Sequence, residues 1–330
     1  MVTIRGYGTY LPLYRIERAT IADQHGDGGD GGETAVPAHD EDVVTLGVAA
    51  AKHALAHADV AAETLGAVYA ASISDPFDER GVAPHIATAL GADPAVRAAD
   101  FGGSARAGTT ALLAGRDAVR AGSGPVLVVA ADLLRAAPGT EAERTAGAGA
   151  GAVVVGRETA DPEPVAAVET VATETTGFVG RFTPAGDSPV AGDARFNRER
   201  YLDAVTAVLN RLEVETPDRV VLAAHDGGWG DRVLRTADLA AERHTAFDRV
   251  GDLGTAAPLV DAALALEAAG AGETVAVVGY GAGGADGFTL RTAAGVERLP
   301  ETTTTDYAES KEYVTYANHR AYREQAGGSA

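Results

Sequence analysis

The chain has 330 residues, of which 46% are hydrophobic and only 5% aromatic, and its formal charge is −20 at pH 7. Its length allows one large domain or two similar halves, its acidity excludes non-specific nucleic-acid binding, and no apolar run is long enough to span a membrane. Cysteine is absent, which excludes disulfides, zinc–thiolate sites and thiol catalysis, and we expect a cytoplasmic protein of a high-salt cell.

Helix and strand patterns alternate along the first half of the chain. Apolar residues recur at helical spacing over 42–58, and Asp40 or Asp42 is the candidate N-cap. The next expected elements are a strand at 67–74, a helix at 82–90, a helix that opens near 104 and ends at Gly122, and strands at 125–132 and 151–156. Strands separated by helices predict βαβ units and a mixed or parallel sheet covered on both faces.

The second half repeats this alternation. We expect helices at 197–214 and 254–270 and strands at 218–226, 273–281 and 287–291. The helix–strand unit that starts at Gly108-Thr109 matches the unit that starts at Gly254-Thr255 in order, length and ending. Such a match predicts a duplicated α/β architecture.

Two polar segments stand outside this pattern. The Gly/Asp loop at 26–33 lacks the carboxylate spacing of a calcium-binding loop, so we expect an acidic insertion there and no metal site. The C-terminal tail at 296–330 carries Tyr313, Tyr316 and Tyr322 as a stripe on a short helix. We expect this tail to dock a partner.

Several stretches within 1–295 share their order and spacing with one known family. They read IRGYGTYLPLYRI, DEDVVTLGVAAAKHAL, SARAGTTAL, VAADLLRAAPGTEAE, AGAGAGAVVVG, LAAHDGG, VGDLGTAAPL and GYGAGG. Together they resemble the thiolase superfamily, and within it the 3-hydroxy-3-methylglutaryl-CoA synthase group of archaeal type. The resemblance implies a homodimer whose chain has two βαβαβ-type halves, at 1–160 and 161–295, in a five-layer α-β-α-β-α arrangement.

The resemblance also implies a site of four parts: a cysteine that takes up the acyl group, a glutamate that moves protons, and a histidine and an asparagine that polarise a thioester carbonyl. Registering Ala-Gly-Thr at 107–109 with the family puts Ala105 at the cysteine position. Ile73, or a neighbour, stands for the glutamate, His225 for the histidine and Asp252 for the asparagine. Alanine cannot form an acyl-enzyme and isoleucine cannot carry a proton, so we do not expect condensation through a covalent intermediate.

Three polar residues near these positions have alternative roles. Ser104 is the obvious substitute nucleophile, although capping of the following helix is the commoner role at such a turn. His225 ends an apolar strand, where α/β proteins place ligands. Asp252 either pairs with His225 as an acid–base couple or caps the helix that starts near Gly254.

A later loop supplies further candidates for substrate binding. Gly281 and Gly283 belong to the Gly-rich turn with which the family lines its acyl site, and Ser104 and Tyr280 complete the expected substrate-binding set. Arg181 matches an arginine in the family's related segment, with a surface ion pair as its alternative role.

Three functions follow from these residues and the resemblance. The first is an acyl-CoA-binding subunit in a complex with a zinc-ribbon/OB-fold protein and a thiolase. The second is an aldolase-like enzyme that makes or breaks C–C bonds in CoA thioesters without cysteine, through His225, Asp252 and Tyr280. The third, an active hydroxymethylglutaryl-CoA synthase, lacks its nucleophile here. In each case a CoA thioester is the expected ligand, with no tightly bound cofactor.

Overall fold

The computed structural model describes residues 1–28, 31–75, 77, 79–184 and 189–326, so two residues of the Gly/Asp loop and the last four of the tail lie outside it. Ten of the described strands form one large sheet, in the order β12-β11-β13-β14-β8-β1-β7-β6-β4-β5. These strands are β1 (Val2–Tyr10), β4 (Ala67–Ala71), β5 (Arg97–Phe101), β6 (Val126–Leu133), β7 (Ala148–Arg157), β8 (Ala166–Thr175), β11 (Arg219–Ala223), β12 (Glu242–Arg243), β13 (Thr274–Gly281) and β14 (Gly284–Thr292).

The two halves of this sheet have the same strand order. Along the chain, the first half contributes β1, β4, β5, β6 and β7 to this sheet, and the second half contributes β8, β11, β12, β13 and β14. In both halves the strands lie, from the outer edge inward, in the order third, second, fourth, fifth and first: β5-β4-β6-β7-β1 and β12-β11-β13-β14-β8. In both halves the first three of these strands pair in parallel and the remaining pairs are antiparallel. β1 and β8 join the halves through two registered pairs, Thr3–Ala167 and Ile4–Ala166.

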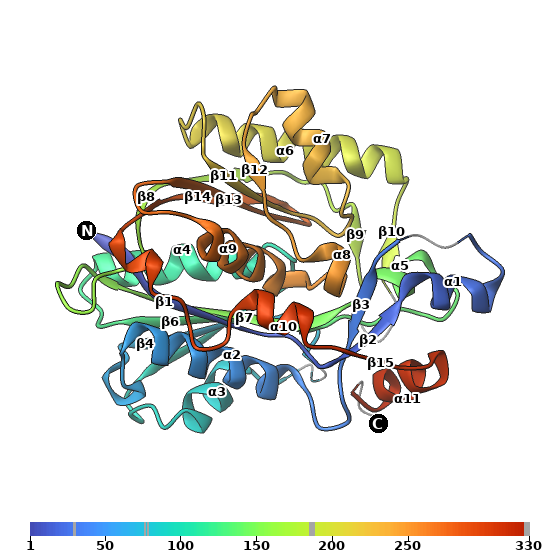
Figure 1. Ribbon diagram of the computed structural model, residues 1–330, viewed down its shortest axis with the longest axis horizontal. Helices are drawn as coiled ribbons and strands as arrows, with labels where there is room; N and C mark the ends of the chain where they lie inside the picture. Colours follow the sequence, from blue (N-terminus) through green and yellow to red (C-terminus); the bar gives the residue numbers. More distant parts are fainter. Residues whose placement is uncertain (29–30, 76, 78, 185–188, 327–330) are drawn as a thin grey trace.

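Helices separate and cover the two halves of the sheet. The main ones are α2 (Val43–Ala58), α3 (Ala83–Ala89), α4 (Ala107–Arg120), α6 (Ala194–Arg211), α7 (Trp229–Ala237) and α9 (Ala257–Ala268). Figure 1 shows α2 and α3 below the first half, α6 and α7 above the second half, and α4 and α9 between them. The N-terminus of α2 carries a capping box, in which Asp42 accepts from the Thr45 N–H.

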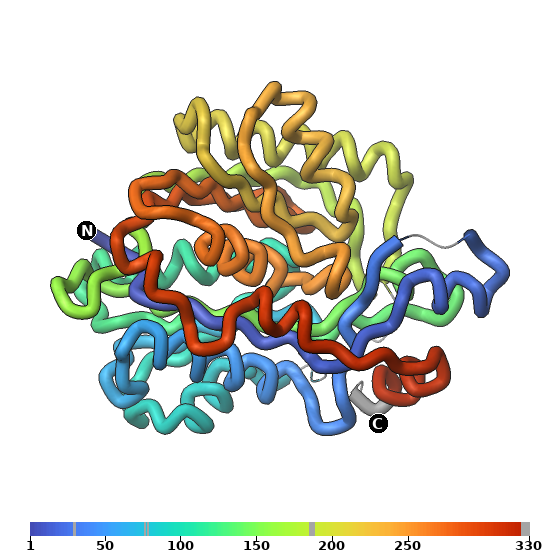
Figure 2. Tube along the Cα trace, viewed as in Figure 1, coloured from blue at the N-terminus to red at the C-terminus, as the bar shows by residue number. Residues whose placement is uncertain are grey.

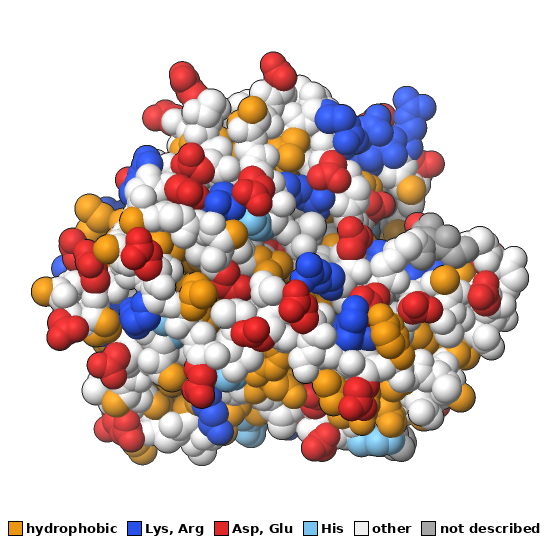
Figure 3. Space-filling model, in the orientation of Figure 1, with side chains coloured by type: hydrophobic (Ala, Val, Ile, Leu, Met, Phe, Trp, Pro, Cys, Tyr) orange, Lys and Arg blue, Asp and Glu red, His pale blue; other side chains and the backbone are white. Residues whose placement is uncertain are grey.

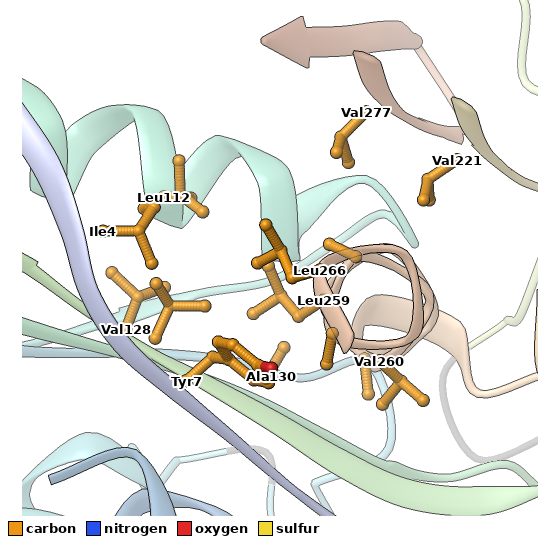
Figure 4. Close-up of a cluster of buried hydrophobic side chains, with 14 of the residues drawn as sticks. Ile4, Tyr7, Leu112, Val128, Ala130, Val221, Leu259, Val260, Leu266 and Val277 are labelled. Atoms are coloured by element: carbon orange, nitrogen blue, oxygen red, sulfur yellow. The ribbon is translucent and has the colours of Figure 1, made fainter. Parts of the chain in front are cut away.

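The middle helices are the pair that the internal repeat identified. Figure 4 shows Leu112 of α4 and Leu259 and Leu266 of α9 packed between side chains of both halves of the sheet. The two helices also meet through glycine, because a Cβ on Gly108 would lie 2.1 Å from the Thr255 carbonyl oxygen. Both helix starts are therefore held together at the centre of the molecule.

The C-terminal tail packs on its own chain. After α10 (Thr304–Glu309), β15 (Glu312–Tyr313) pairs in parallel with β2 (Tyr14–Glu17), which also pairs with β3 (Glu33–Val36). Figure 2 shows the tail running beside the N-terminal segment. Two of the stripe tyrosines are used internally, since the Tyr316 hydroxyl donates to Glu143 at 3.0 Å and Tyr322 packs against His39. Docking of a partner by this tail stays a prediction.

The last helix, α11 (Tyr316–Ala326), holds one buried and one half-buried basic side chain. His319 is fully buried, and the guanidinium of Arg323 donates to the carbonyls of Leu134, Ala35 and Ala146. The tail thus reaches the segments that follow β6 and precede β7. None of the helices in the described ranges has the length and apolarity that crossing a bilayer requires.

Three short helices complete the set: α1 (Arg18–His25), α5 (Glu141–Thr145) and α8 (Phe247–Val250). A small hairpin of β9 (Arg181–Phe182) and β10 (Val190–Ala191) stands apart from the large sheet. This hairpin precedes α6 and forms part of the site described next.

Candidate functional site

A cavity of about 740 Å³ lies where the two halves meet. Its walls come from the segments that follow β4, β5 and β6 in the first half and β11 and β13 in the second, together with the β9–β10 hairpin. The strands within each of these two groups are parallel, so within each half of the sheet their carboxyl ends lie together. The carboxyl ends of parallel strands are where open α/β sheets bind ligands.

Most of the residues expected from the sequence meet at this cavity. Its lining includes Ser104, Ala105, His225, Asp252, Tyr280, Gly281 and Arg181. Gly283 is not in the lining; it has a φ of +88° in the turn between β13 and β14, and its N–H donates to the Phe178 carbonyl at 3.0 Å.

Ser104 does not cap α4, contrary to the role favoured above. The helix begins at Ala107 without a side-chain cap, and the Ser104 hydroxyl donates to the Ala282 carbonyl at 2.9 Å. The reason is the close approach of the β13–β14 turn, where a Cβ on Gly281 would lie 2.3 Å from the Ser104 Oγ and 2.8 Å from the Ala105 nitrogen. Glycine is required at 281, and backbone forms this part of the wall.

His225 lies two residues after the end of β11 and packs edge-on against Trp229, with ring centroids 4.4 Å apart. Burial lowers the pKa of His225; the charge of Asp252 opposes this shift and that of Arg181 adds to it. The imidazole is therefore neutral near pH 7. A neutral imidazole can accept a proton at one nitrogen and donate a hydrogen bond from the other.

Asp252 pairs with arginine rather than with His225. One carboxylate oxygen accepts from Arg181 at 2.7 Å and the other from the Gly254 N–H at 2.9 Å. No ion pair within 4.0 Å joins Asp252 to His225 in the described part of the chain. Of the two roles left open for Asp252, the structure shows the backbone contact at Gly254 and no direct pair with His225, because the other oxygen is bonded to Arg181. Arg181 has a buried partner instead of a surface one.

Behind the cavity wall, a buried carboxylate organises the segment around Ile73. Ile73 lines the cavity, and its N–H donates to the Asp132 Oδ1 at 2.8 Å. The hydroxyls of Ser72 and Ser74 donate to the same oxygen, and the Thr255 N–H and hydroxyl donate to the other. Burial raises the pKa of Asp132, and these hydrogen bonds oppose the shift.

Sequence reasoning did not name five polar residues of the lining: Ser74, Asp75, Arg135, Thr183 and Asn197. Asp75 and Arg135 follow β4 and β6, so their positions after buried strands were a usable signal. Asn197 lies on α6 and gave no such signal. Tyr280 was expected, but burial raises its pKa to about 12, which makes it a weak acid near neutral pH. In the described ranges, no three His, Asp or Glu side chains are grouped to hold a metal.

Curated proteins similar in sequence match the chain over nearly all its length. It is 31% identical over 339 residues to the hydroxymethylglutaryl-CoA synthase of Methanopyrus kandleri, covering 96% of each chain. It is 30% identical over 348 residues to the synthase of the same description from Methanobrevibacter smithii, covering 98% of this chain and 99% of that one. No family model matches.

Solved structures share the fold at lower identity. An MvaS protein in complex with 3-hydroxy-3-methylglutaryl coenzyme A has a TM-score of 0.82 at 19% identity, covering 99% of this chain and 93% of that chain. The HMG synthase of the curacin biosynthetic pathway has a TM-score of 0.84 at 19% identity, covering 98% and 88%. A 3-oxoacyl-(acyl carrier protein) synthase III from Pseudomonas aeruginosa has a TM-score of 0.74 at 22% identity, covering 88% and 98%.

Proposed function

Because the chain belongs to the hydroxymethylglutaryl-CoA synthase family, we propose that its cavity binds an acyl-CoA thioester without forming an acyl-enzyme. The observation that carries this proposal is the position of Ala105, which precedes α4 and lines the same cavity as His225. A methyl group has no electron pair to attack a thioester. The acyl group therefore stays on CoA while the surrounding site is kept.

The neutral imidazole of His225 supports a role in holding the thioester. A ring N–H that faces the cavity can donate to the thioester carbonyl, and burial strengthens such a hydrogen bond. The buried Arg181–Asp252 pair fixes the neighbouring wall, since Asp252 also accepts from the backbone of Gly254. In this account His225 contacts the ligand and Asp252 positions the wall.

We also propose that the chain has the detailed architecture of the family. The two halves, 1–160 and 161–295, would be copies of one thiolase-like βαβαβ unit in a five-layer α-β-α-β-α arrangement. The repeated strand order and the matching Gly-Thr helix starts support this. A site between two copies explains why Ala105 and His225 come from different halves.

We also propose a homodimer and a complex with a zinc-ribbon/OB-fold protein and a thiolase. The dimer is supported by β5, a five-residue edge strand bonded only to β4 among the described residues. The larger complex is supported by the loss of the nucleophile, because a non-acylated subunit would present its thioester to another protein. Size-exclusion chromatography with light scattering tests the dimer, and co-purification tests the complex.

A second candidate function is cysteine-independent C–C bond chemistry on the bound thioester, which the lowered pKa of His225 favours. The neutral ring would take a proton from the carbon next to the thioester carbonyl, leaving an enolate. The enolate carbon would attack a second carbonyl, and the imidazolium would return the proton to the resulting alkoxide. No net proton is consumed, and the reverse sequence is C–C cleavage.

Replacement of His225 separates these two functions. With the co-purified complex and a panel of acyl-CoA thioesters, turnover that falls at least 100-fold in His225→Ala and not in His85→Ala indicates catalysis. His85 is an exposed histidine on α3 and serves as the matched control. Binding of thioesters without turnover indicates a binding subunit. Failure of CoA and every thioester to bind would contradict the proposed function in both forms.

A further inference from the structure

Phenylalanine side chains gather at and beside the cavity. The protein has only 7 phenylalanines. Phe77 and Phe182 line the cavity, while Phe178 and Phe196 pack edge-on beside it, with ring centroids 5.2 Å apart. A chain so poor in aromatic residues has placed four of its phenylalanines around one hollow.

The apolar side chains of the lining are also unusually exposed. Phe77 is 53% exposed, Val179 51%, Phe182 49% and Ile73 40%. They come from the segment after β4 and from the β9–β10 hairpin with the residues just before it. Solvent-exposed apolar groups that line a concave site of this volume mark a surface that a ligand covers.

The basic side chains that line the cavity are poorly placed to bind an acyl group that carries a carboxylate. Among described residues, the lining cations are Arg135 and Arg181. Arg181 already pairs with Asp252 at 2.7 Å, and Arg135 is exposed on the segment after β6. An additional carboxylate beside the Arg181–Asp252 pair would face the charge of Asp252 and would lose its hydration.

We infer that the acyl group held in this cavity is a hydrocarbon chain or ring of several carbons, covered by the apolar wall of Ile73, Phe77, Val179 and Phe182. This inference rests on the proposed function and narrows its ligand from any CoA thioester to a hydrophobic one. The replacement of the family's glutamate by Ile73 fits this assignment, because it removes a charge from that wall and adds an alkyl group.

Calorimetric titration of the full chain at high salt tests the inference with CoA, acetyl-CoA, hexanoyl-CoA, octanoyl-CoA and 3-hydroxy-3-methylglutaryl-CoA. Each fully buried methylene should raise the affinity about fourfold, so burial of only two or three of the additional methylenes of octanoyl-CoA should make it bind roughly 30-fold more tightly than acetyl-CoA. Phe182→Ala should lower the octanoyl-to-acetyl affinity ratio at least about fivefold. Tyr313→Ala, which removes an aromatic ring that is 56% exposed on β15, should leave that ratio unchanged.

The outcomes separate the inference from the function on which it rests. Equal affinities for acetyl-CoA and octanoyl-CoA, or tightest binding of 3-hydroxy-3-methylglutaryl-CoA, would overturn the hydrophobic assignment and leave thioester binding intact. Absence of binding by CoA and all four thioesters would overturn both. A melting temperature of Phe182→Ala within about 2 °C of the parent value shows that the ratio reports the wall and not misfolding.

Discussion

At the scale of single residues, a buried polar framework stands behind the wall of the cavity. Asp132 receives hydrogen bonds from the segment after β4 on one oxygen and from Thr255 on the other. This carboxylate fixes Ile73 next to the start of the middle helices. The segment that carries Ile73 is thus fixed by a buried carboxylate.

Asp132→Asn tests this framework. Either orientation of the amide would turn an NH₂ group toward backbone and hydroxyl donors, so we expect the free energy of unfolding to fall by about 2–4 kcal/mol. Chemical denaturation measures the loss. Asp59→Asn is the control, because Asp59 is exposed with a φ of 50° that asparagine tolerates, and its effect should stay within about 0.5 kcal/mol. Equal losses of unfolding free energy in Asp132→Asn and Asp59→Asn would contradict the stabilising role of the hydrogen bonds to Asp132.

Sequence reasoning found the residues whose chain position signals their role. His225 ends an apolar strand, and Ala105 lies before a helix that begins with a repeated Gly-Thr pair. Ile73 was found only through the family resemblance. The ion pair of Arg181 with Asp252 was not foreseen, because its partners are 71 residues apart and meet only in the folded molecule.

At the scale of elements, the first strand, β1, was not predicted, and the cause is physical. β1 contains Gly6 and Gly8, which weaken a strand pattern in sequence. In the fold, a Cβ on either residue would lie 2.5 Å from a backbone nitrogen of α2. The glycines let the helix lie directly on the strand, a contact that only the tertiary structure reveals. The helices at 42–58 and 254–270 were predictable because their apolar periodicity and caps are local.

The C-terminal helix gives a prediction with a defined pH range. Burial lowers the pKa of His319 to about 3, and Arg323 and Arg320 further disfavour the charged ring. The unfolded chain binds this proton near pH 6.5, so the stabilisation by neutral His319 is complete above that pH and is lost as the pH falls toward 3. At pH 5 the loss should be about 2 kcal/mol.

His319→Leu should remove this component of the acid sensitivity. We expect the difference in unfolding free energy between pH 7 and pH 5 to shrink by about 2 kcal/mol in the variant. His85→Leu, at an exposed position of α3, should keep the parent difference. Parallel pH dependence of the His319→Leu variant and the parent would show that this ring is not buried against the protein in solution.

At the scale of the whole molecule, the amount and distribution of charge determine how stability depends on salt. Figure 3 shows acidic side chains spread over the visible face rather than gathered in one patch, while basic groups cluster near the N-terminal part of α6. Lysine occurs only at Lys52 and Lys311. A charge of −20 distributed in this way destabilises the compact state by self-repulsion unless salt screens it.

The melting temperature should therefore rise with potassium chloride between about 0.1 M and 3 M, most steeply below about 1 M, where the Debye length shrinks from about 10 Å to about 3 Å. Calorimetry across a salt series measures this. Sucrose at matched osmolality is the control, because it stabilises a protein by being excluded from the protein surface and does not screen charges. A melting temperature that is flat over the salt series would contradict the inference of adaptation to a high-salt cytoplasm.

The account rests on Ala105 occupying the place where a cysteine would be acylated, and intact-mass spectrometry tests this most directly. After incubation with acetyl-CoA or octanoyl-CoA, the parent protein should keep its mass, whereas Ala105→Cys should gain one acyl group that hydroxylamine removes, because its thiol lies at the start of α4 in the same cavity as His225. Acylation of the parent chain, or an Ala105→Cys variant that binds the thioester but is never acylated, would contradict the account.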